Sequence, residues 1–321
     1  MSKESTMSHA LERSRLAAAL FLSSVVACGE AETPGTSGNS GGGGSSGIGG
    51  SSGGSGTGGV DASSGGAGSG GEAATGGNVS DAGDAGDGSA FDCVSTGSTM
   101  KMIAIPAGDF VMGCNAAVDS DCSEDEKPMH TVTLSAFEID ETEVTQDHYA
   151  ACVKAGACDP PSCTWDCSKH DYAAGCLDWS RAKMYCAFAQ KRLPTEAEWE
   201  KAARGSDGRK YPWGSAEPSC AQANMSGCGE KAKPVGSAPS GASPYGVLDL
   251  AGNMVEMVAD WYDANYYASA PKVDPKGPLK GTRYVGRGGG FKSTAVWMRA
   301  SSRDWYDTYD VGERLGFRCA R

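Results

Sequence analysis

Residues 192–205 read RLPTEAEWEKAARG and carry the strongest helix signal in the chain. Thr195 and Glu198 have the spacing of a capping box, in which a hydroxyl and a carboxylate bind free amides of the first helical turn. Trp199 and the alanines three and four residues after it share one helical face. Gly205 is a residue type that commonly ends helices. The segment therefore predicts a short helix that begins after Thr195 and ends at Gly205.

Short strands and two more helices are expected upstream. Residues 102–113 predict two short strands around a turn, and apolar alternation predicts one strand over residues 131–140. Thr145 is expected to cap a helix, and residues 182–189 place small, aromatic and cysteine side chains at the i, i+3, i+4, i+7 spacing of another. Residues 206–321 are rich in aromatic residues, Gly, Pro, Asn and Asp and show no such pattern. The predicted class is therefore α+β with little regular secondary structure, its second half held by loops and side-chain bonds.

The N-terminal part is rich in glycine. Of 47 glycines, 25 lie between Gly29 and Ala90. Glycine loses the most backbone entropy on folding and buries no side chain, so such a stretch forms no packed core. We therefore expect residues 28–91 to be a disordered tether and residues 92–321 to be one folded domain.

Residues 1–27 predict a lipoprotein signal peptide. Basic residues precede an apolar run that is too short to span a bilayer. The run ends in VVAC, which resembles the lipobox of bacterial lipoproteins, so we expect acylation of Cys28 and anchoring to a membrane by several acyl chains. Gly29 rather than Asp after this cysteine favours the outer membrane, with the domain on the periplasmic or the surface face of the cell envelope. The alternative is an ordinary signal peptide with an accidental cysteine.

The charge pattern excludes one class of partner. The formal net charge is −12, and the tether contains acidic residues but no basic one. Nucleic-acid binders carry clustered Lys and Arg along the chain, and this sequence has no such cluster. We therefore expect no nucleic-acid partner.

Twelve cysteines remain besides Cys28, and disulfides are the default in an exported chain. The alternative interpretation of the four cysteines from Cys158 to Cys176, which lie close to His170 in the sequence, is a zinc site. Their spacing matches no familiar zinc motif, so disulfides are favoured. Three short loops are plausible pairs: Cys114–Cys122, Cys152–Cys158 and Cys220–Cys228.

The segment 192–205, followed by YPWG at 211–214, resembles the signature of the formylglycine-generating enzyme (sulfatase-modifying factor) family. Further matching motifs run in order to the C-terminus: EVT at 143–145, GN at 252–253, RGG at 287–289 and GFRC at 316–319. The resemblance covers the whole domain. It implies a variant of the C-type lectin fold and a disulfide between Cys186 and Cys319.

The resemblance also implies an activity, the oxidation of a cysteine in an unfolded sulfatase segment to formylglycine. The family uses molecular oxygen and copper held by two cysteines, because soft thiolates select Cu(I). Here those positions fall at about Ser293 and Ala295, and the segment contains no cysteine. A hydroxyl and a methyl group cannot replace two thiolates. We therefore assign no catalytic residue, and we do not expect copper.

A structural calcium ion is the cofactor that the resemblance does imply. The ligands would be the carboxylates of Asp249 and Glu256 with the carbonyls of Gly252 and Met254. A second, less complete site would begin with Asn224 and the carbonyl of Met225. Hard oxygen ligands on an irregular loop suit Ca²⁺. The alternative is a solvated acidic turn.

Two functions follow. The first is an exported lipoprotein of this family that modifies a sulfatase or another exported protein or peptide substrate, with altered chemistry because the cysteine pair is missing. The second is a non-catalytic, membrane-tethered, lectin-like binding module for a surface ligand.

Overall fold

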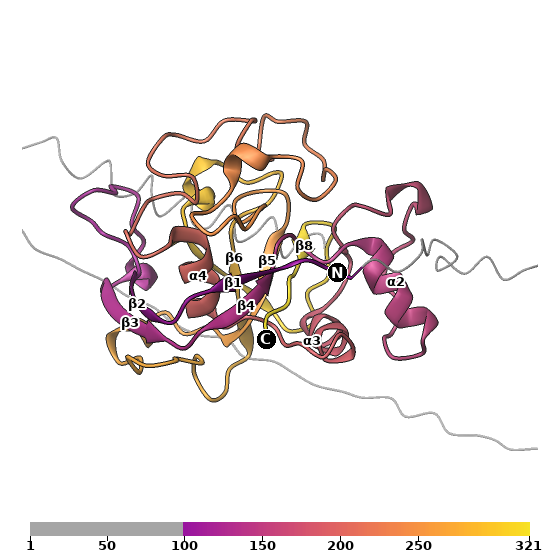
Figure 1. Ribbon diagram of the computed structural model, residues 1–321, viewed down its shortest axis with the longest axis horizontal. Helices are drawn as coiled ribbons and strands as arrows, with labels where there is room; N and C mark the ends of the chain where they lie inside the picture. Colours follow the sequence, from indigo (N-terminus) through magenta and orange to yellow (C-terminus); the bar gives the residue numbers. More distant parts are fainter. Residues whose placement is uncertain (1–98) are drawn as a thin grey trace, which may run out of the picture. The chain divides into compact units, whose positions relative to one another are not determined.

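The computed structural model describes residues 99–321 (Figure 1). The predictions for the signal peptide, Cys28 and the tether lie outside the described residues. The elements follow in the order β1 (Met102–Ile105), β2 (Gly108–Met112), η1 (Glu124–Glu126), β3 (His130–Leu134), β4 (Phe137–Asp140), α2 (Gln146–Lys154), η2 (Cys167–Lys169), α3 (Trp179–Phe188), α4 (Glu196–Arg204), η3 (Pro239–Gly241), β5 (Val255–Trp261), η4 (Tyr266–Ala268), β6 (Arg283–Arg287), η5 (Ala295–Met298), β7 (Arg303–Asp307) and β8 (Leu315–Gly316). Within residues 99–321, no helix has the length and apolarity needed to cross a bilayer.

The first four strands form two small antiparallel sheets. β1 and β2 are the two predicted strands, but they do not pair with each other: β1 pairs with β4 and β2 with β3. The prediction of one strand over residues 131–140 is wrong, because the strand is interrupted between β3 and β4, where the chain passes from one sheet to the other. At the break, the backbone amide and Oγ of Ser135 donate hydrogen bonds to Asp274, each 2.8 Å long.

A four-stranded sheet of order β7-β6-β5-β8 lies in the C-terminal half, where no regular element was predicted. That prediction is wrong for a physical reason. β5 is buried along almost its whole length, so its sequence VEMVADW lacks the alternation of a strand with one wet face. β6 ends in Arg287, a residue type usually found on surfaces, yet this side chain is buried.

Helices α3 and α4 cover opposite faces of this sheet. Met257 of β5 packs in the same core cluster as Trp179 of α3. The next residue, Val258, packs in the cluster that contains Trp199 of α4. Successive side chains of a strand point to opposite faces, so the sheet is enclosed between the two helices.

The predicted helix at residues 192–205 is confirmed as α4. The capping box is complete: the Glu198 amide donates to Thr195 Oγ1 at 3.2 Å, and the Thr195 amide donates to Glu198 Oε2 at 2.8 Å. The helix ends at Gly205, whose φ is +68°. Every residue of α4 is buried, so its polar side chains form internal ion pairs, such as Glu200 with Arg287 at 2.5 Å.

The other two predicted helices are also present. The hydroxyl of Thr145 accepts a hydrogen bond from the His148 amide and caps α2. The periodic residues 182–189 fall within α3, except that Ala189 is its C-terminal cap.

Disulfides bind the loops together. The three short-loop pairs expected from the sequence are present, and Cys163–Cys176 and Cys186–Cys319 complete five pairs. Cys167 is disulfide-bonded as well. The cysteines between Cys158 and Cys176 therefore offer no thiolate to zinc, and the disulfide interpretation is the one that the structure supports.

Candidate functional site

Ser293 lies in the loop that joins β6 to η5, next to the turn formed by Gly288 and Gly289, and Ala295 is the first residue of η5. The Oγ of Ser293 accepts a hydrogen bond of 3.0 Å from the Gly290 amide, so it is used inside its own loop. The cavity at this position measures about 10 Å³, which is hardly room for one water molecule. The side chains present therefore fit neither a copper ion nor a substrate.

Space at this turn is limited by side chains of η5. A Cβ atom added to Gly289 would lie 2.7 Å from the methyl carbon of Met298 and 3.0 Å from Cβ of Trp297. The φ of Gly289 is +65°, which also favours glycine. The turn is thus tightly packed against the helix that follows it.

Arg299 anchors the C-terminal end of this loop. Its guanidinium donates to both carboxylate oxygens of Glu126, at 2.6 and 2.7 Å, and to Asp119 at 3.2 Å. Burial raises the pKa of Glu126, whereas the hydrogen bonds and charge of Arg299 lower it. A buried, doubly bonded pair of this kind holds the loop in one position.

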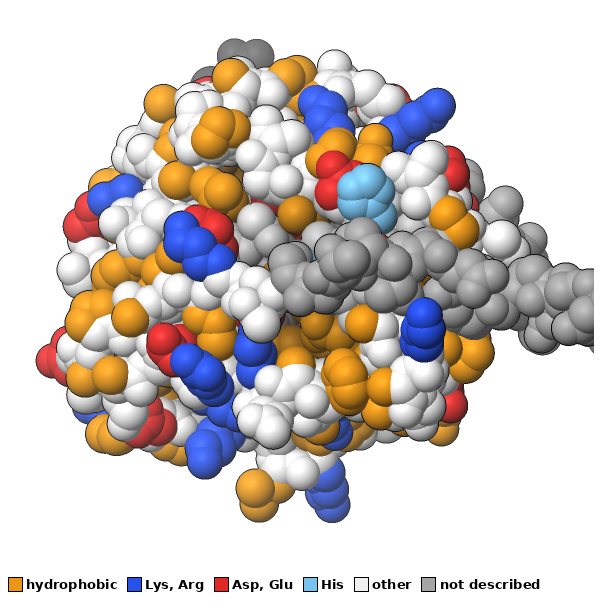
Figure 2. All heavy atoms as spheres, turned by 45° about the vertical axis from the view of Figure 1, so that its right-hand side comes forward, with side chains coloured by type: hydrophobic (Ala, Val, Ile, Leu, Met, Phe, Trp, Pro, Cys, Tyr) orange, Lys and Arg blue, Asp and Glu red, His pale blue; other side chains and the backbone are white. Residues whose placement is uncertain are grey.

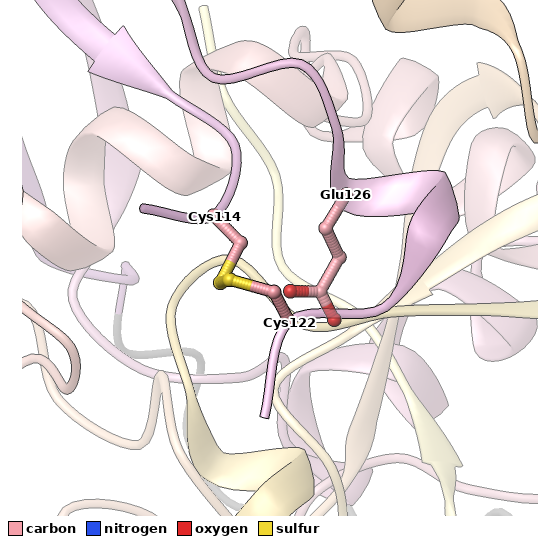
Figure 3. Close-up of side chains that lie close together, drawn as sticks. All are labelled: Cys114, Cys122 and Glu126. Carbon is pink, nitrogen blue, oxygen red and sulfur yellow. A yellow bond between two sulfur atoms is a disulfide. The ribbon is translucent and has the colours of Figure 1, made fainter. Parts of the chain in front are cut away.

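Glu126 also lies close to the sulfur atoms of Cys114 and Cys122, and this is the one compact group of metal-ligand side chains among residues 99–321 (Figure 3). The two sulfur atoms are joined in a disulfide. Because neither sulfur is a thiolate and Glu126 is bound by Arg299, this group is structural and does not suit a metal.

The implied calcium loop lies between η3 and β5. Asp249 has a φ of +59° and accepts a hydrogen bond from the Gly236 amide. Glu256 is buried, and its carboxylate receives two bonds of 2.7 Å from Arg318 and one of 2.9 Å from the indole of Trp199. Its charge is thus already balanced, so Glu256 is the weaker of the two implied carboxylate ligands.

The structure adds Glu143, the first residue of the EVT motif, which was not predicted to belong to the calcium site. Its side chain is fully buried, and Oε1 accepts a hydrogen bond of 2.9 Å from Asn253, while Oε2 has no partner. Burial raises the pKa of Glu143 well above its ordinary value, and the carboxylates of Asp249 and Glu256 raise it further. Glu143 and Asp249 therefore share a buried region with too few donors for their oxygens. The sequence holds no signal for this, because 106 residues separate the two.

The two implied metal sets lie side by side. A Cβ on Gly252 would sit 2.5 Å from the carbonyl oxygen of Asn224, so only glycine permits this approach. The side-chain amide nitrogen of Asn224 donates a hydrogen bond of 3.1 Å to Oδ1 of Asn253. The Oδ1 atom of Asn224 is buried without a hydrogen-bond partner. The oxygens able to hold a hard cation are thus those of Glu143, Asp249 and Asn224.

The remaining two implied residues contribute packing. Met225 packs partly buried against a small core cluster that includes Tyr211. The side chain of Met254 is buried and clusters with Ala173 and Phe291. The carbonyl of Met225 accepts a hydrogen bond of 3.0 Å from the Cys228 amide, and neither side chain offers an oxygen.

Larger open spaces lie outside the closed cavity at Ser293, and the first of them is bordered by Phe291 and Lys292 of the same loop. One cleft of about 510 Å³ runs beside the disulfide Cys163–Cys176 and is bordered by Lys231 and Lys292. A second groove of about 600 Å³ lies between α3 and the segment around Asp274. Both are in the size range of ligand-binding sites.

Together these features define a disulfide-bonded α+β domain of low regular content, with buried ion pairs around one signature helix. The profile of the family described as "Sulfatase-modifying factor enzyme 1-like domain" matches residues 90–321. The chain belongs to this family, whose curated members include formylglycine-generating enzymes.

The similarity extends along most of the relatives' length. The chain is 32% identical over 285 residues to the formylglycine-generating enzyme of Streptomyces coelicolor, which covers 70% of this chain and 90% of that enzyme. It is 29% identical over 245 residues to hercynine oxygenase of Mycolicibacterium smegmatis, covering 63% and 57%. The solved structure of PvdO from Pseudomonas aeruginosa superimposes with a TM-score of 0.60 at 28% identity, covering 68% and 93%. The fold class predicted from the sequence is therefore confirmed.

Proposed function

We propose that this chain is a membrane-tethered member of the family that does not make formylglycine with copper and instead binds a ligand. The observation that carries the proposal is the filled position of the copper loop, which contains no cysteine and where Ser293 borders a cavity of only about 10 Å³. Similarity to formylglycine-generating enzymes favours the second candidate, an enzyme that acts on an exported protein.

Two chemical arguments weigh against copper oxidation. Cu(I) is held by soft sulfur ligands, and every cysteine among residues 99–321 is bound in a disulfide. A cysteine substrate also needs space beside the metal, whereas Trp297 and Met298 pack against the turn at Gly289. Among the described residues the thiolate ligands are missing, and the cavity beside Ser293 has no room for a substrate.

Calcium is proposed as a structural ion. Glu143 and Asp249 place two carboxylates in a buried region, where like charges and desolvation disfavour ionisation unless a cation compensates. A bound Ca²⁺ would neutralise them and order the loop that leads into β5. Carboxylate and amide oxygens are ligands that Ca²⁺ accepts in irregular geometry.

The tether and anchor are proposed from the sequence. Acylation at Cys28 would hold the domain at a membrane of the cell envelope, and the glycine-rich residues 28–91 would give it reach. Incorporation of radiolabelled palmitate checks this: label is expected on the wild type and not on Cys28→Ser. Label that survives the substitution, or no label on the wild type, would reject it.

The decisive test of function is an aldehyde assay. The full chain is incubated with a Cys-x-Pro-x-Arg peptide with and without copper, and the peptide mass is measured. No aldehyde is expected, whereas the Streptomyces coelicolor enzyme in a parallel reaction should form it. Aldehyde formation by this chain would refute the proposal and favour the enzyme.

A further inference from the structure

A groove of about 600 Å³ crosses the domain between α3, the break between β3 and β4, and the segment Asp274–Lys276. It lies away from the copper loop and the calcium loop, and it shares no lining residue with either. We call it the basic groove. The signature segment 192–205 contributes Arg192, Leu193, Thr195 and Glu198 to its lining, and the other lining residues lie outside the family motifs.

The floor of the basic groove is apolar. Leu134, Phe137 and Leu193 reach it from three different segments, and Ala187 and Ala259 complete it. Lys191, Arg192 and Thr195 interrupt this floor. Apolar patches that alternate with polar groups suit a chain with alternating side chains better than one continuous hydrocarbon chain.

Five basic side chains line the groove, although the sequence has no basic cluster. They come from distant segments: Lys183, Lys191, Arg192, Lys276 and Arg321. Figure 2 shows Lys and Arg side chains gathered among hydrophobic ones in the lower half of the molecule, at the height of α3 and the C-terminus in Figure 1. Glu198 and Asp274 also line the groove, so basic side chains outnumber acidic ones by five to two on a chain of net charge −12.

Two of these cations are available to a ligand. Lys191, Arg192 and Arg321 form salt bridges with Asp140, Glu198 and Glu138. Within residues 99–321, Lys183 and Lys276 form no salt bridge, and both are exposed. The ammonium of Lys183 lies 4.2 Å from the ring centre of Trp179, which positions it at the α3 side of the groove.

The opposite lip is anchored and presents apolar side chains. Asp274 is bound by the amide and hydroxyl of Ser135, each at 2.8 Å. On either side of the segment Asp274–Lys276, Val273 is 63% and Leu279 102% exposed. Neither side chain lines the groove itself, but both lie beside its lip and are available for apolar contact with a bound ligand.

We propose that the basic groove binds an acidic peptide that also carries apolar side chains, which deepens the binding function proposed above and rests on it. Carboxylates of the peptide would pair with Lys183 and Lys276. Its apolar side chains would contact the floor and the exposed side chains of Val273 and Leu279. Charge complementarity favours an acidic ligand, and the interrupted floor favours a peptide over a lipid chain.

The test uses the full chain carrying Cys28→Ser, so that acylation cannot contribute. Fluorescence anisotropy measures binding of a labelled decapeptide of alternating Glu and Leu, and of its counterpart in which Gln replaces Glu. The Glu peptide is expected to bind at least about tenfold more tightly, with an affinity that falls as salt rises, because exposed charges are screened. Equal binding of the two peptides would overturn the proposal.

Matched variants locate the site. Lys183→Gln with Lys276→Gln is expected to weaken binding of the Glu peptide about tenfold. Lys231→Gln with Lys292→Gln removes the same charge from the other cleft and should leave binding unchanged. Equal losses in both pairs would show non-specific attraction and contradict the groove. Phosphatidylglycerol vesicles that displace the peptide, and whose binding needs Lys183 and Lys276, would assign the groove to lipid instead.

The two proposals can fail separately. Aldehyde formation would reject the proposed function, whether or not the Glu peptide binds in the groove. Without aldehyde, equal binding of the Glu and Gln peptides would reject only the acidic-peptide ligand.

Discussion

The indole nitrogen of Trp199 donates a hydrogen bond of 2.9 Å to Oε2 of Glu256, and both side chains are buried. This bond joins the signature helix α4 to β5, directly after the loop implied to bind calcium. The same carboxylate receives two bonds from Arg318 at 2.7 Å. A helix recognised from local sequence is thus fastened to the C-terminal half through this carboxylate as well as through the pair of Glu200 and Arg287.

Replacing Trp199 tests this connection. Trp199→Phe keeps an aromatic ring but removes the donor, and we expect the free energy of unfolding to fall by about 1–3 kcal/mol, since one acceptor on a buried charge loses its partner. Urea denaturation measures it. The control is Trp213→Phe, whose more exposed indole bonds the Ala216 carbonyl, and it should change stability by about 0.5 kcal/mol or less. Equal losses would contradict the role assigned to the Trp199 bond.

Local signals in the sequence predicted the helices well and the central sheet poorly. The capping box of Thr195 and Glu198 is complete within four residues, so it is readable without tertiary structure. The strand β6 contains Arg287, which is buried only because Glu200 of α4 pairs with it. That partner is 87 residues away, and no local pattern indicates it.

Part of the candidate site could likewise be predicted from local sequence, and part of it could not. Loss of the copper ligands could be inferred at Ser293 and Ala295, because the family motif brackets them. The participation of Glu143 could not, since its buried oxygen is defined by long-range packing against the loop of Asp249. The basic groove was hidden for the same reason, as Lys183 and Lys276 lie 93 residues apart.

Asp260 gives a prediction for pH dependence. Burial raises its pKa well above the ordinary value of 3.8, and the charge of Glu196 raises it further, whereas the hydrogen bond from the Glu196 amide lowers it. A carboxyl group with a raised pKa in the folded state binds protons more tightly there than in the unfolded chain. Its contribution to stability is therefore greatest below the unfolded pKa and is lost as pH rises from about 4 through the folded pKa.

Asp260→Asn should remove this loss. The substitution keeps an oxygen to accept from the Glu196 amide but no longer titrates. The stability of the variant relative to the wild type is expected to increase as pH rises from about 4 through the folded pKa of Asp260, measured by urea denaturation at each pH. Asp263→Asn, at a neighbouring exposed position, serves as the control. Parallel pH profiles for wild type and Asp260→Asn would show that Asp260 is not the titrating group.

Removal of calcium gives the third prediction. A ligand present at about 100 times its Kd stabilises the native state by about 2.7 kcal/mol, which for a domain of this size corresponds to about 5–10 °C in Tm. EDTA is expected to lower the Tm by this amount, and added Ca²⁺ to restore it. Glu143→Gln should lose most of the calcium-dependent gain, because it removes the oxygen that lacks a partner.

The matched control for calcium is Glu230→Gln, which alters an exposed carboxylate bound to the Gly227 amide. It should keep the full response to calcium. An unchanged melt of the wild type in EDTA, with no calcium found by elemental analysis, would leave the alternative of an ion-free acidic turn.

The disulfides provide the last prediction, because their loops differ greatly in length. Cys186–Cys319 spans 133 residues and joins α3 to the C-terminus, whereas Cys220–Cys228 spans 8. If a cross-link stabilises by restricting the unfolded chain, the two should contribute about 5 and about 2.6 kcal/mol. Replacing each pair with alanine and measuring urea denaturation should therefore show a loss about 2 kcal/mol larger for Cys186 and Cys319. These two residues are also fully buried, which can only increase their loss. A smaller loss for the long loop would mean that residual structure in the unfolded chain already holds α3 near the C-terminus.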